Sequence, residues 1–166
     1  MKLSALYQIF LDCQSVTTDS RNCPDGSLFI ALKGESFNGN AFAKLALDSG
    51  CAFAIIDEIQ YAVEDNQRYI LVDDCLQTMQ QLANYHRRQL GTRVIGITGT
   101  NGKTTTKELI SSVLCQAHNV LYTLGNLNNH IGVPLTLLAM TRDVEFGIVE
   151  LSLIHISEPT RQAEIS

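Results

Sequence analysis

The segment that most constrains the fold is glycine-rich and lies between two apolar runs. It reads Gly99-Thr100-Asn101-Gly102-Lys103-Thr104-Thr105. The run before it, RVIGIT, is typical of a buried strand, and the run after it, KTTTKELISSVLCQA, is typical of a helix. On that helix the pattern predicts that one side faces inward, and this side carries Leu109, Ile110, Val113 and Leu114. This order of strand, glycine loop and helix places backbone N–H groups and a helix N-terminus around phosphate oxygens. It therefore predicts a binding site for a nucleoside triphosphate.

Two residues at the end of this loop suit phosphate chemistry. Lys103 can offset charge on the β- and γ-phosphates, and the Thr104 hydroxyl can ligate Mg²⁺. The strict pattern G-x-x-x-x-G-K-[ST] has a glycine where Ile97 stands, and the glycines available here are Gly96 and Gly99. The alternative interpretation is a glycine-rich turn without a ligand, which explains neither the lysine nor the threonine at these positions.

Two later segments are candidates for the same site. Glu150 ends the apolar strand FGIVE, so its carboxylate is expected at the carboxyl edge of the sheet as a second Mg²⁺ ligand. A glutamate at a strand end is otherwise more often a solvated charge. The loop GNLNNHIG carries Asn126, Asn128 and Asn129, which supply either turn chemistry or amide donors for phosphate oxygens. Residue type alone favours the turn.

The alternation of apolar runs with helical patterns predicts an α/β fold in two parts. In residues 1–90, strands are expected at 27–32, 51–57 and 69–74 and helices at 40–48 and 75–90, the last ending at Gly91. Residues 91–150 continue with RVIGIT, NVLYT, a helix after Pro134 and FGIVE, which is the beginning of a doubly wound sheet. The pattern therefore predicts a small α/β domain followed by the start of a phosphate-loop domain.

The last sixteen residues, LSLIHISEPTRQAEIS, do not continue this alternation. They contain neither a long helical pattern nor a closing strand, although a nucleotide-binding sheet normally has five or more strands. We interpret residues 151–166 as a tail foreign to the fold, and the preceding domain as truncated. The alternative is a genuine short C-terminus.

Composition excludes several classes of function. A net charge of -5, from 17 acidic and 12 basic residues without a basic run, gives no support for binding nucleic acid or an anionic membrane. The N-terminus lacks the features of a secretion signal, and no segment is long and apolar enough for membrane insertion. The cysteines form no C-x-x-C pair, which favours buried thiols in a reducing cytoplasm: Cys13, Cys23, Cys51, Cys75 and Cys115.

Together these motifs resemble the Mur ligase family. The match includes the loop GTNGKTT, VTTDSR at 16–21, LFIALKGESFNGNAF at 28–42 and CAFAIID, and it covers residues 1 to about 150. The segment GNLNNHIGVPLTLL at 125–138 is similar to the family member that adds D-alanyl-D-alanine to a UDP-N-acetylmuramoyl tripeptide. The family usually has an acidic residue where His130 stands.

The resemblance implies two sets of ligand contacts. ATP would be bound by the phosphate loop with two later asparagines, Mg²⁺ by Thr104 and Glu150, and catalysis would rest on Lys103 and Glu150. The ATP contacts are Gly99, Thr100, Asn101, Gly102, Lys103, Thr104, Thr105, Asn126 and Asn129. The contacts to the uridine diphosphate are Ser20, Arg21, Lys33, Gly34, Asn38 and Gly39. An arginine fork suits phosphate, and the glycines of the loop from Lys33 to Gly39 would let backbone approach a ligand.

The implied reaction is ATP-dependent amide-bond formation through an acyl phosphate, in a cytoplasmic monomer. Its partners would be the UDP-N-acetylmuramoyl tripeptide and D-alanyl-D-alanine, and the chain alone is expected to be inactive. Two alternatives remain open. One is a related ligase, either the diaminopimelate- or lysine-adding Mur enzyme or a folylpolyglutamate synthase. The other is a nucleotide- or UDP-sugar-binding module without turnover.

Overall fold

The computed structural model describes residues 1–64 and 66–152. The chain forms two compact units, Met1–Leu82 and Ala83–Ser166. The expectation that residues 151–166 are foreign to the fold falls outside the described residues, apart from the first two positions.

The division between the units lies within helix α3 (Cys75–Leu90), whereas the sequence suggests a boundary at Gly91. The last turns of α3 belong to the second unit, where His86 Nε2 donates a hydrogen bond to the Met140 carbonyl oxygen at 2.8 Å. Gly91 ends the helix as expected, with a left-handed φ of 69°. Helix α3 therefore contributes residues to both units.

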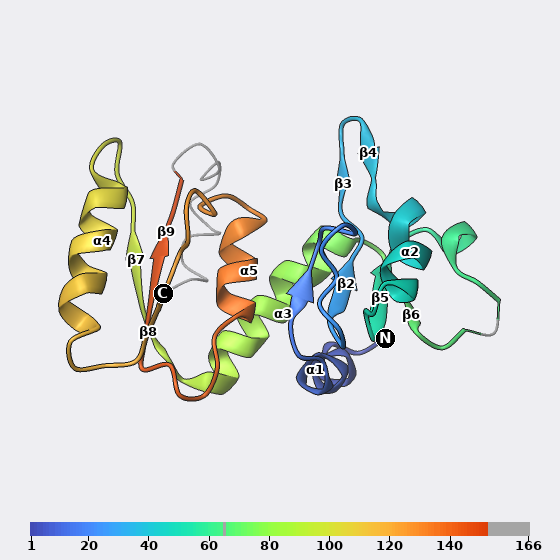
Figure 1. Ribbon diagram of the computed structural model, residues 1–166, viewed down its shortest axis with the longest axis horizontal. Helices are drawn as coiled ribbons and strands as arrows, with labels where there is room; N and C mark the ends of the chain where they lie inside the picture. The colour runs from blue at the N-terminus through green and yellow to red at the C-terminus, as the bar shows by residue number, and fades with distance from the viewer. Residues whose placement is uncertain (65, 153–166) are drawn as a thin grey trace. The chain divides into compact units, whose positions relative to one another are not determined.

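The first unit contains a parallel sheet in the order β1-β2-β5-β6. Its strands are β1 (Val16–Thr17), β2 (Leu28–Ile30), β5 (Phe53–Ile56) and β6 (Tyr69–Leu71). Helix α2 (Ala43–Asp48) packs on β5 and β2. The remaining elements are α1 (Leu3–Asp12), the hairpin strands β3 (Lys33–Gly34) and β4 (Phe37–Asn38), and the short helices η1 (Gly39–Phe42) and η2 (Ile59–Tyr61). Figure 1 shows the hairpin extending beyond β2.

The central strands of this sheet are apolar on both faces. All three residues of β2 are buried, and so are Ala54, Ile55 and Ile56 of β5. Continuous apolar strands are typical of parallel sheets covered on both sides. The strands expected at 27–32, 51–57 and 69–74 are therefore confirmed, with shorter bounds.

The sequence analysis did not anticipate α1 or the β3–β4 hairpin. Helix α1 buries Leu6, Tyr7 and Phe10, which share one helical face. That spacing was a usable signal in the N-terminal segment. The hairpin strands are two residues each, too short to give an alternating pattern.

The second unit contains a parallel sheet in the order β7-β9-β8. Its strands are β7 (Arg93–Ile97), β8 (Val120–Tyr122) and β9 (Phe146–Glu150), and its further helices are α4 (Lys103–Leu114) and α5 (Gly132–Leu138). Helices α4 and α5 cover opposite faces of the sheet (Figure 1). This arrangement confirms the predicted start of a doubly wound α/β fold.

The predicted inner side of α4 was wrong at two positions. Leu109 is 63% exposed and Val113 is 69% exposed, whereas Lys107 and Ser111 are buried. Helix α4 packs on β7, β8 and β9, and this tertiary contact, which the helical pattern alone does not contain, sets the rotation of the helix about its axis. This rotation directs Lys107, rather than Leu109 and Val113, toward the sheet.

The cysteines are free thiols in different environments. Cys51 and Cys75 are buried as predicted, and burial raises the pKa of the Cys75 thiol to about 12. Cys115 is exposed, which corrects the expectation of burial for that residue, because it follows the end of α4 at the surface. Raised pKa values keep buried thiols protonated and unreactive.

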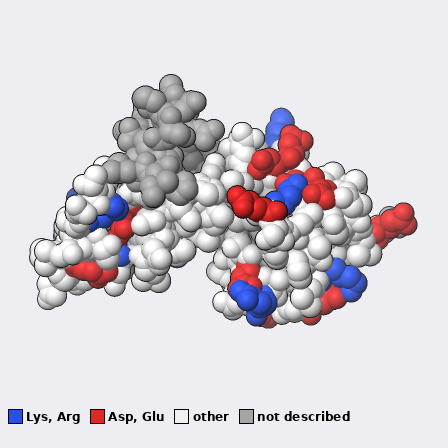
Figure 2. Space-filling model, turned by 90° about the horizontal axis from the view of Figure 1, so that it is seen from above, with Lys and Arg blue, Asp and Glu red and all other residues white. Residues whose placement is uncertain are grey.

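Surface charges of both signs lie close together. On the face shown in Figure 2, acidic and basic side chains occur in small mixed groups separated by uncharged areas. An anionic ligand would then be held by specific contacts instead of a general positive field. In the described part of the chain, no helix is long and apolar enough to cross a membrane.

We predict that Gly39→Ala destabilises the first unit while Gly34→Ala does not. A Cβ on Gly39 would lie 2.4 Å from the Leu32 carbonyl oxygen, but one on Gly34 would meet nothing within 4 Å. Because the clash is with backbone, we expect Gly39→Ala to cost about 1–3 kcal/mol. Urea denaturation followed by circular dichroism measures the difference, and equal stability of the two variants would contradict the packing.

Candidate functional site

The register of the second sheet brings the glycine loop beside Glu150. Strands β7 and β9 are parallel, with Ile97 paired to Glu150. The chain leaves β7 into the loop at this position, and Leu151 N donates to the Ile97 carbonyl oxygen at 2.8 Å. The carboxyl ends of parallel strands share one edge, so the predicted phosphate and metal residues are brought together there.

Two glycines shape the loop itself. Gly99 and Gly102 have φ angles of 148° and 77°, which residues with a Cβ rarely adopt. Gly102 precedes the first residue of α4, Lys103, whose Nζ donates to the Gly99 carbonyl oxygen at 2.8 Å. The lysine therefore folds back over the loop, and the helix N-terminus lies at the loop's end, as an anion cradle requires.

Glu150 is the most connected side chain at this edge, although only 2% of its surface is exposed. Its Oε2 accepts a hydrogen bond from Thr104 Oγ1 at 3.1 Å, and its Oε1 accepts one from Asn128 Nδ2 at 2.9 Å. Lys107 Nζ lies 3.8 Å from Oε2. The Glu150 backbone N–H donates to Thr123 Oγ1 at 3.0 Å. Main chain and carboxylate are thus both held.

The pair of Thr104 and Glu150 fits a magnesium ion. Their oxygens are 3.1 Å apart, close to the separation of neighbouring oxygen ligands when each bond is about 2.1 Å. Within residues 1–64 and 66–152, no three His, Cys, Asp or Glu side chains form a metal-binding cluster. A site with two chain oxygens suits Mg²⁺, which commonly takes its other ligands from phosphate and water.

The three asparagines of the loop have different partners, and the one that reaches Glu150 is not among the two expected to contact ATP. Asn129 Oδ1 accepts hydrogen bonds from Ile131 N at 3.0 Å and Gly132 N at 2.8 Å, which holds the turn before α5. Asn126 is exposed and its carbonyl accepts from Asn128 N. Asn128, which no ligand assignment included, is the one that reaches Glu150. Three asparagines within four positions gave no local signal to separate these roles.

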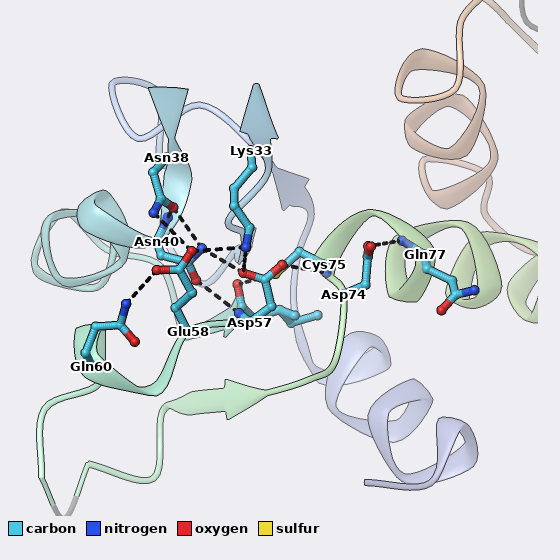
Figure 3. A network of polar contacts seen from close by, with 10 residues as sticks. Lys33, Asn38, Asn40, Asp57, Glu58, Gln60, Asp74, Cys75 and Gln77 are labelled. Atoms are coloured by element: carbon cyan, nitrogen blue, oxygen red, sulfur yellow. Dashed lines mark hydrogen bonds and ion pairs between the residues drawn. The ribbon is translucent and has the colours of Figure 1, made fainter. Parts of the chain in front are cut away.

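The carboxyl edge of the first sheet carries a second polar network (Figure 3). Lys33 Nζ lies 3.0 Å from Asp57 Oδ1 and 3.0 Å from Glu58 Oε1. Asn38 Nδ2 also donates to Glu58 Oε1, at 3.2 Å. Asn40, 1% exposed, donates through Nδ2 to Asp57 and accepts from the Asp57 backbone N–H. The hairpin is thereby tied to the end of β5.

Asp57 and Glu58 were not identified from the sequence, although they directly follow the apolar strand β5 and Glu150 is the last residue of the apolar strand β9. Burial raises the pKa of the Asp57 carboxyl, but hydrogen bonds from Lys33, Asn40 and the Cys75 N–H outweigh burial and leave that pKa below its usual value. Asp57 is therefore held as a carboxylate. Its position after β5 was a signal that the rule for strand ends could have used.

The predicted uridine diphosphate contacts lie at the ends of β1 and β2. Arg21, 87% exposed, donates Nε and Nη2 to the two Asp19 carboxylate oxygens, and this pairing lowers the Asp19 pKa to about 2. Ser20 is half-buried at the same turn. Gly34 is exposed in the hairpin, and Gly39 is buried against Leu32. Arg21, like Lys33 and Asn38, therefore already has partners within the chain.

The chain is similar to known proteins along most of its length. The chain matches two family models: the Mur ligase family catalytic domain over residues 12–87 and the Mur ligase middle domain over residues 97–166. The second match includes the segment interpreted above as foreign, and that interpretation stays a prediction.

Individual proteins are similar over most of the chain. A Bacillus subtilis UDP-N-acetylmuramoyl-tripeptide–D-alanyl-D-alanine ligase is 47% identical over 138 residues, which is 83% of this chain and 30% of the relative. A crystal structure of MurF from Acinetobacter baumannii has a TM-score of 0.81 and 32% identity, covering 95% of this chain and 37% of that one. The structure of MurF ligase from Thermotoga maritima in complex with ADP has a TM-score of 0.77 and 29% identity, covering 94% and 35%. The chain thus spans about a third of the length of these proteins.

We predict that Thr123→Val destabilises the second unit more than Thr123→Ser. Thr123 is fully buried, and its hydroxyl is the acceptor for the Glu150 N–H. Valine has nearly the same shape but leaves that N–H unsatisfied, at a cost of about 1–3 kcal/mol. Serine keeps the acceptor and loses only a methyl group. Thermal unfolding compares them, and a valine variant at least as stable as the serine variant would contradict this role of the hydroxyl.

Proposed function

The chain belongs to the Mur ligase family, and from this premise we propose that it forms the UDP-substrate unit and phosphate loop of an ATP-dependent ligase. The ligase would join D-alanyl-D-alanine to a UDP-N-acetylmuramoyl tripeptide, the activity in the name of the Bacillus subtilis relative. Because the chain corresponds to about a third of such relatives, the activity is proposed for a full-length protein that contains it.

One observation carries this proposal: the Thr104 hydroxyl and the buried Glu150 carboxylate meet beside the glycine loop. A merely structural glycine turn would not require a threonine and a buried acid within hydrogen-bonding distance. The similar MurF ligase from Thermotoga maritima forms a complex with ADP, which supports nucleotide binding as a property of this chain.

The chain's residues would act on ATP by position and charge. Backbone N–H groups of the loop and the N-terminus of α4 would bind the phosphates, and Lys103 would leave Gly99 to neutralise charge on the transferred phosphoryl group. Thr104 and Glu150 would hold Mg²⁺, which lowers the charge repulsion between the phosphates and the attacking carboxylate.

The reaction needs activation because a carboxylate is a poor acylating agent. The substrate carboxylate attacks the γ-phosphorus and the bond to the bridging oxygen of ADP breaks, which gives an acyl phosphate and ADP. The amine of D-alanyl-D-alanine then attacks the acyl carbon, loses a proton, and releases inorganic phosphate. We place this chemistry in the cytoplasm, where UDP-linked precursors and ATP are both available, in a monomeric enzyme.

The first unit would bind the uridine diphosphate at the carboxyl edge of its sheet. Ser20 and Arg21 follow β1, and the hairpin from Lys33 to Gly39 follows β2, so both lie at the edge where ligands of parallel sheets bind. Arg21 has guanidinium N–H groups beyond the two that Asp19 accepts. Those remaining donors would face the diphosphate.

Substrate choice tests the proposal against the alternatives. Full-length protein should release phosphate from ATP only when the UDP-muramoyl tripeptide and D-alanyl-D-alanine are both present. Turnover of the UDP-muramoyl dipeptide with diaminopimelate or lysine would indicate the related Mur ligase instead. Nucleotide binding without turnover of any pair would indicate a binding module.

We predict that Lys103→Ala lowers ligation by about 100-fold or more while leaving affinity for the UDP substrate unchanged, because the loop and the UDP site belong to separate units. Lys44→Ala removes an exposed lysine paired with Asp48 on α2 and serves as the matched control. Steady-state kinetics and calorimetry measure the two effects. Equal loss of UDP-substrate affinity would show that the two-site assignment is wrong.

We predict that Arg21→Ala raises KM for the UDP substrate by about tenfold or more with no change in KM for ATP, because a charge-assisted phosphate contact is lost. Asp19→Asn is the control, since it keeps the arginine and removes only its carboxylate partner. It should not raise KM. An unchanged constant for Arg21→Ala would leave Arg21 a solvated turn residue.

A further inference from the structure

Helix α4 buries a lysine that the proposed reaction does not use. Lys107 is 1% exposed and lies one turn after Lys103. Its Nζ lies 3.8 Å from Glu150 Oε2 and 3.3 Å from Glu108 Oε1, and Glu108 is a largely exposed side chain. A buried cation is costly unless charged partners compensate it, so its place beside Glu150 calls for a physical reason.

Lys107 is not placed to touch a nucleotide. Lys103 Nζ reaches the loop carbonyl of Gly99, on the side where phosphates would bind. Lys107, in contrast, is enclosed between α4 and the sheet. Lys107 therefore would not contact a bound nucleotide, and Glu150 is the proposed metal ligand that it lies beside.

Asn128 contacts the other oxygen of the same carboxylate. Asn128 Nδ2 donates to Oε1, while Thr104 and Lys107 lie on the side of Oε2. A metal bound by Thr104 and Glu150 would replace the hydrogen bond between them. Lys107 and Asn128 would then be the remaining side chains that orient the carboxylate.

We propose that Lys107 and Asn128 are positioning residues that hold the Glu150 carboxylate toward the Thr104 hydroxyl, so that a metal-ligand oxygen is in place before the nucleotide arrives. The inference rests on the proposed function of the loop as an ATP and Mg²⁺ site. Residues that orient a metal ligand from outside the coordination sphere change metal affinity by about 10- to 100-fold when removed.

Because Lys107 is positively charged, an orienting role and a purely electrostatic role predict opposite effects on metal affinity. An ammonium near a divalent cation repels it, so a lysine acting by charge alone would weaken metal binding, and its removal would strengthen it. A lysine that orients Glu150 has the opposite effect. Lys107→Met should therefore weaken metal binding by about tenfold or more if positioning dominates. Asn128→Ala changes no charge and should also weaken metal binding.

The test measures the metal directly in the full-length protein. Mn²⁺ binding in the presence of ADP is titrated by electron paramagnetic resonance, and ADP affinity in EDTA is measured separately by calorimetry. We expect both variants to lose about tenfold or more in Mn²⁺ affinity while ADP affinity in EDTA stays as in the wild type. A role limited to folding the loop would lower ADP affinity in EDTA as well.

Controls separate the remaining explanations. Glu108→Gln removes the exposed partner of Lys107 and should leave Mn²⁺ affinity unchanged, whereas Glu150→Gln should lose it. Lys107→Met removes one member of a buried pair and can prevent folding. If it does not fold, Asn128→Ala, a substitution in a loop, is the variant that decides. Unchanged Mn²⁺ affinity in Asn128→Ala, or tighter binding in Lys107→Met, overturns the inference alone. A wild-type protein that binds neither ADP nor Mn²⁺ overturns the proposed function and the inference together.

Discussion

The parallel register that pairs Ile97 with Glu150 is the constraint on which the nucleotide site depends. Shifting it by one residue would turn the Glu150 side chain to the other face of the sheet, away from Thr104. The register is held on both sides of the strand end, by the Leu151 N–H to the Ile97 carbonyl and by the Glu150 N–H to Thr123 Oγ1. These two hydrogen bonds from backbone N–H groups thus fix the position of Glu150 at the strand end. The flexible side chain alone would not determine where the carboxylate lies.

Because the Glu150 carboxylate is buried, its charge has to be compensated by neighbouring groups. Glu150 and Lys107 are 2% and 1% exposed, and charges removed from water must be compensated by partners of opposite sign and by hydrogen bonds. The protein supplies Lys107, Asn128 and Thr104 for one carboxylate. In such a region, hydrogen bonds are stronger than at the surface, and each unmet one is more costly. A precise orientation of Glu150 follows from this requirement.

Both units carry polar residues at the carboxyl edge of a parallel sheet, but the two edges differ in what they leave available to a ligand. In the second, the edge leads into a glycine loop and a helix N-terminus, which leaves backbone N–H groups for a ligand. In the first, Lys33, Asn40, Asp57 and Glu58 satisfy one another and fasten the hairpin to the sheet (Figure 3). A ligand there would meet a preorganised edge, in which some of the charges are already neutralised within the chain.

The sequence by itself determined the local pieces: the glycine loop between strand and helix, the apolar strands β2, β5 and β9, and the end of α3 at Gly91. Each depends on neighbours within a few residues, such as a left-handed turn or a continuous apolar run. Tertiary structure alone decided that α4 presents Lys107 instead of Leu109 to the sheet, and that Asn128 is the asparagine that reaches Glu150. These outcomes could not be read locally, because the rotation of a helix and the reach of a side chain are set by strands that meet across more than fifty positions of the chain, as Ile97 and Glu150 do.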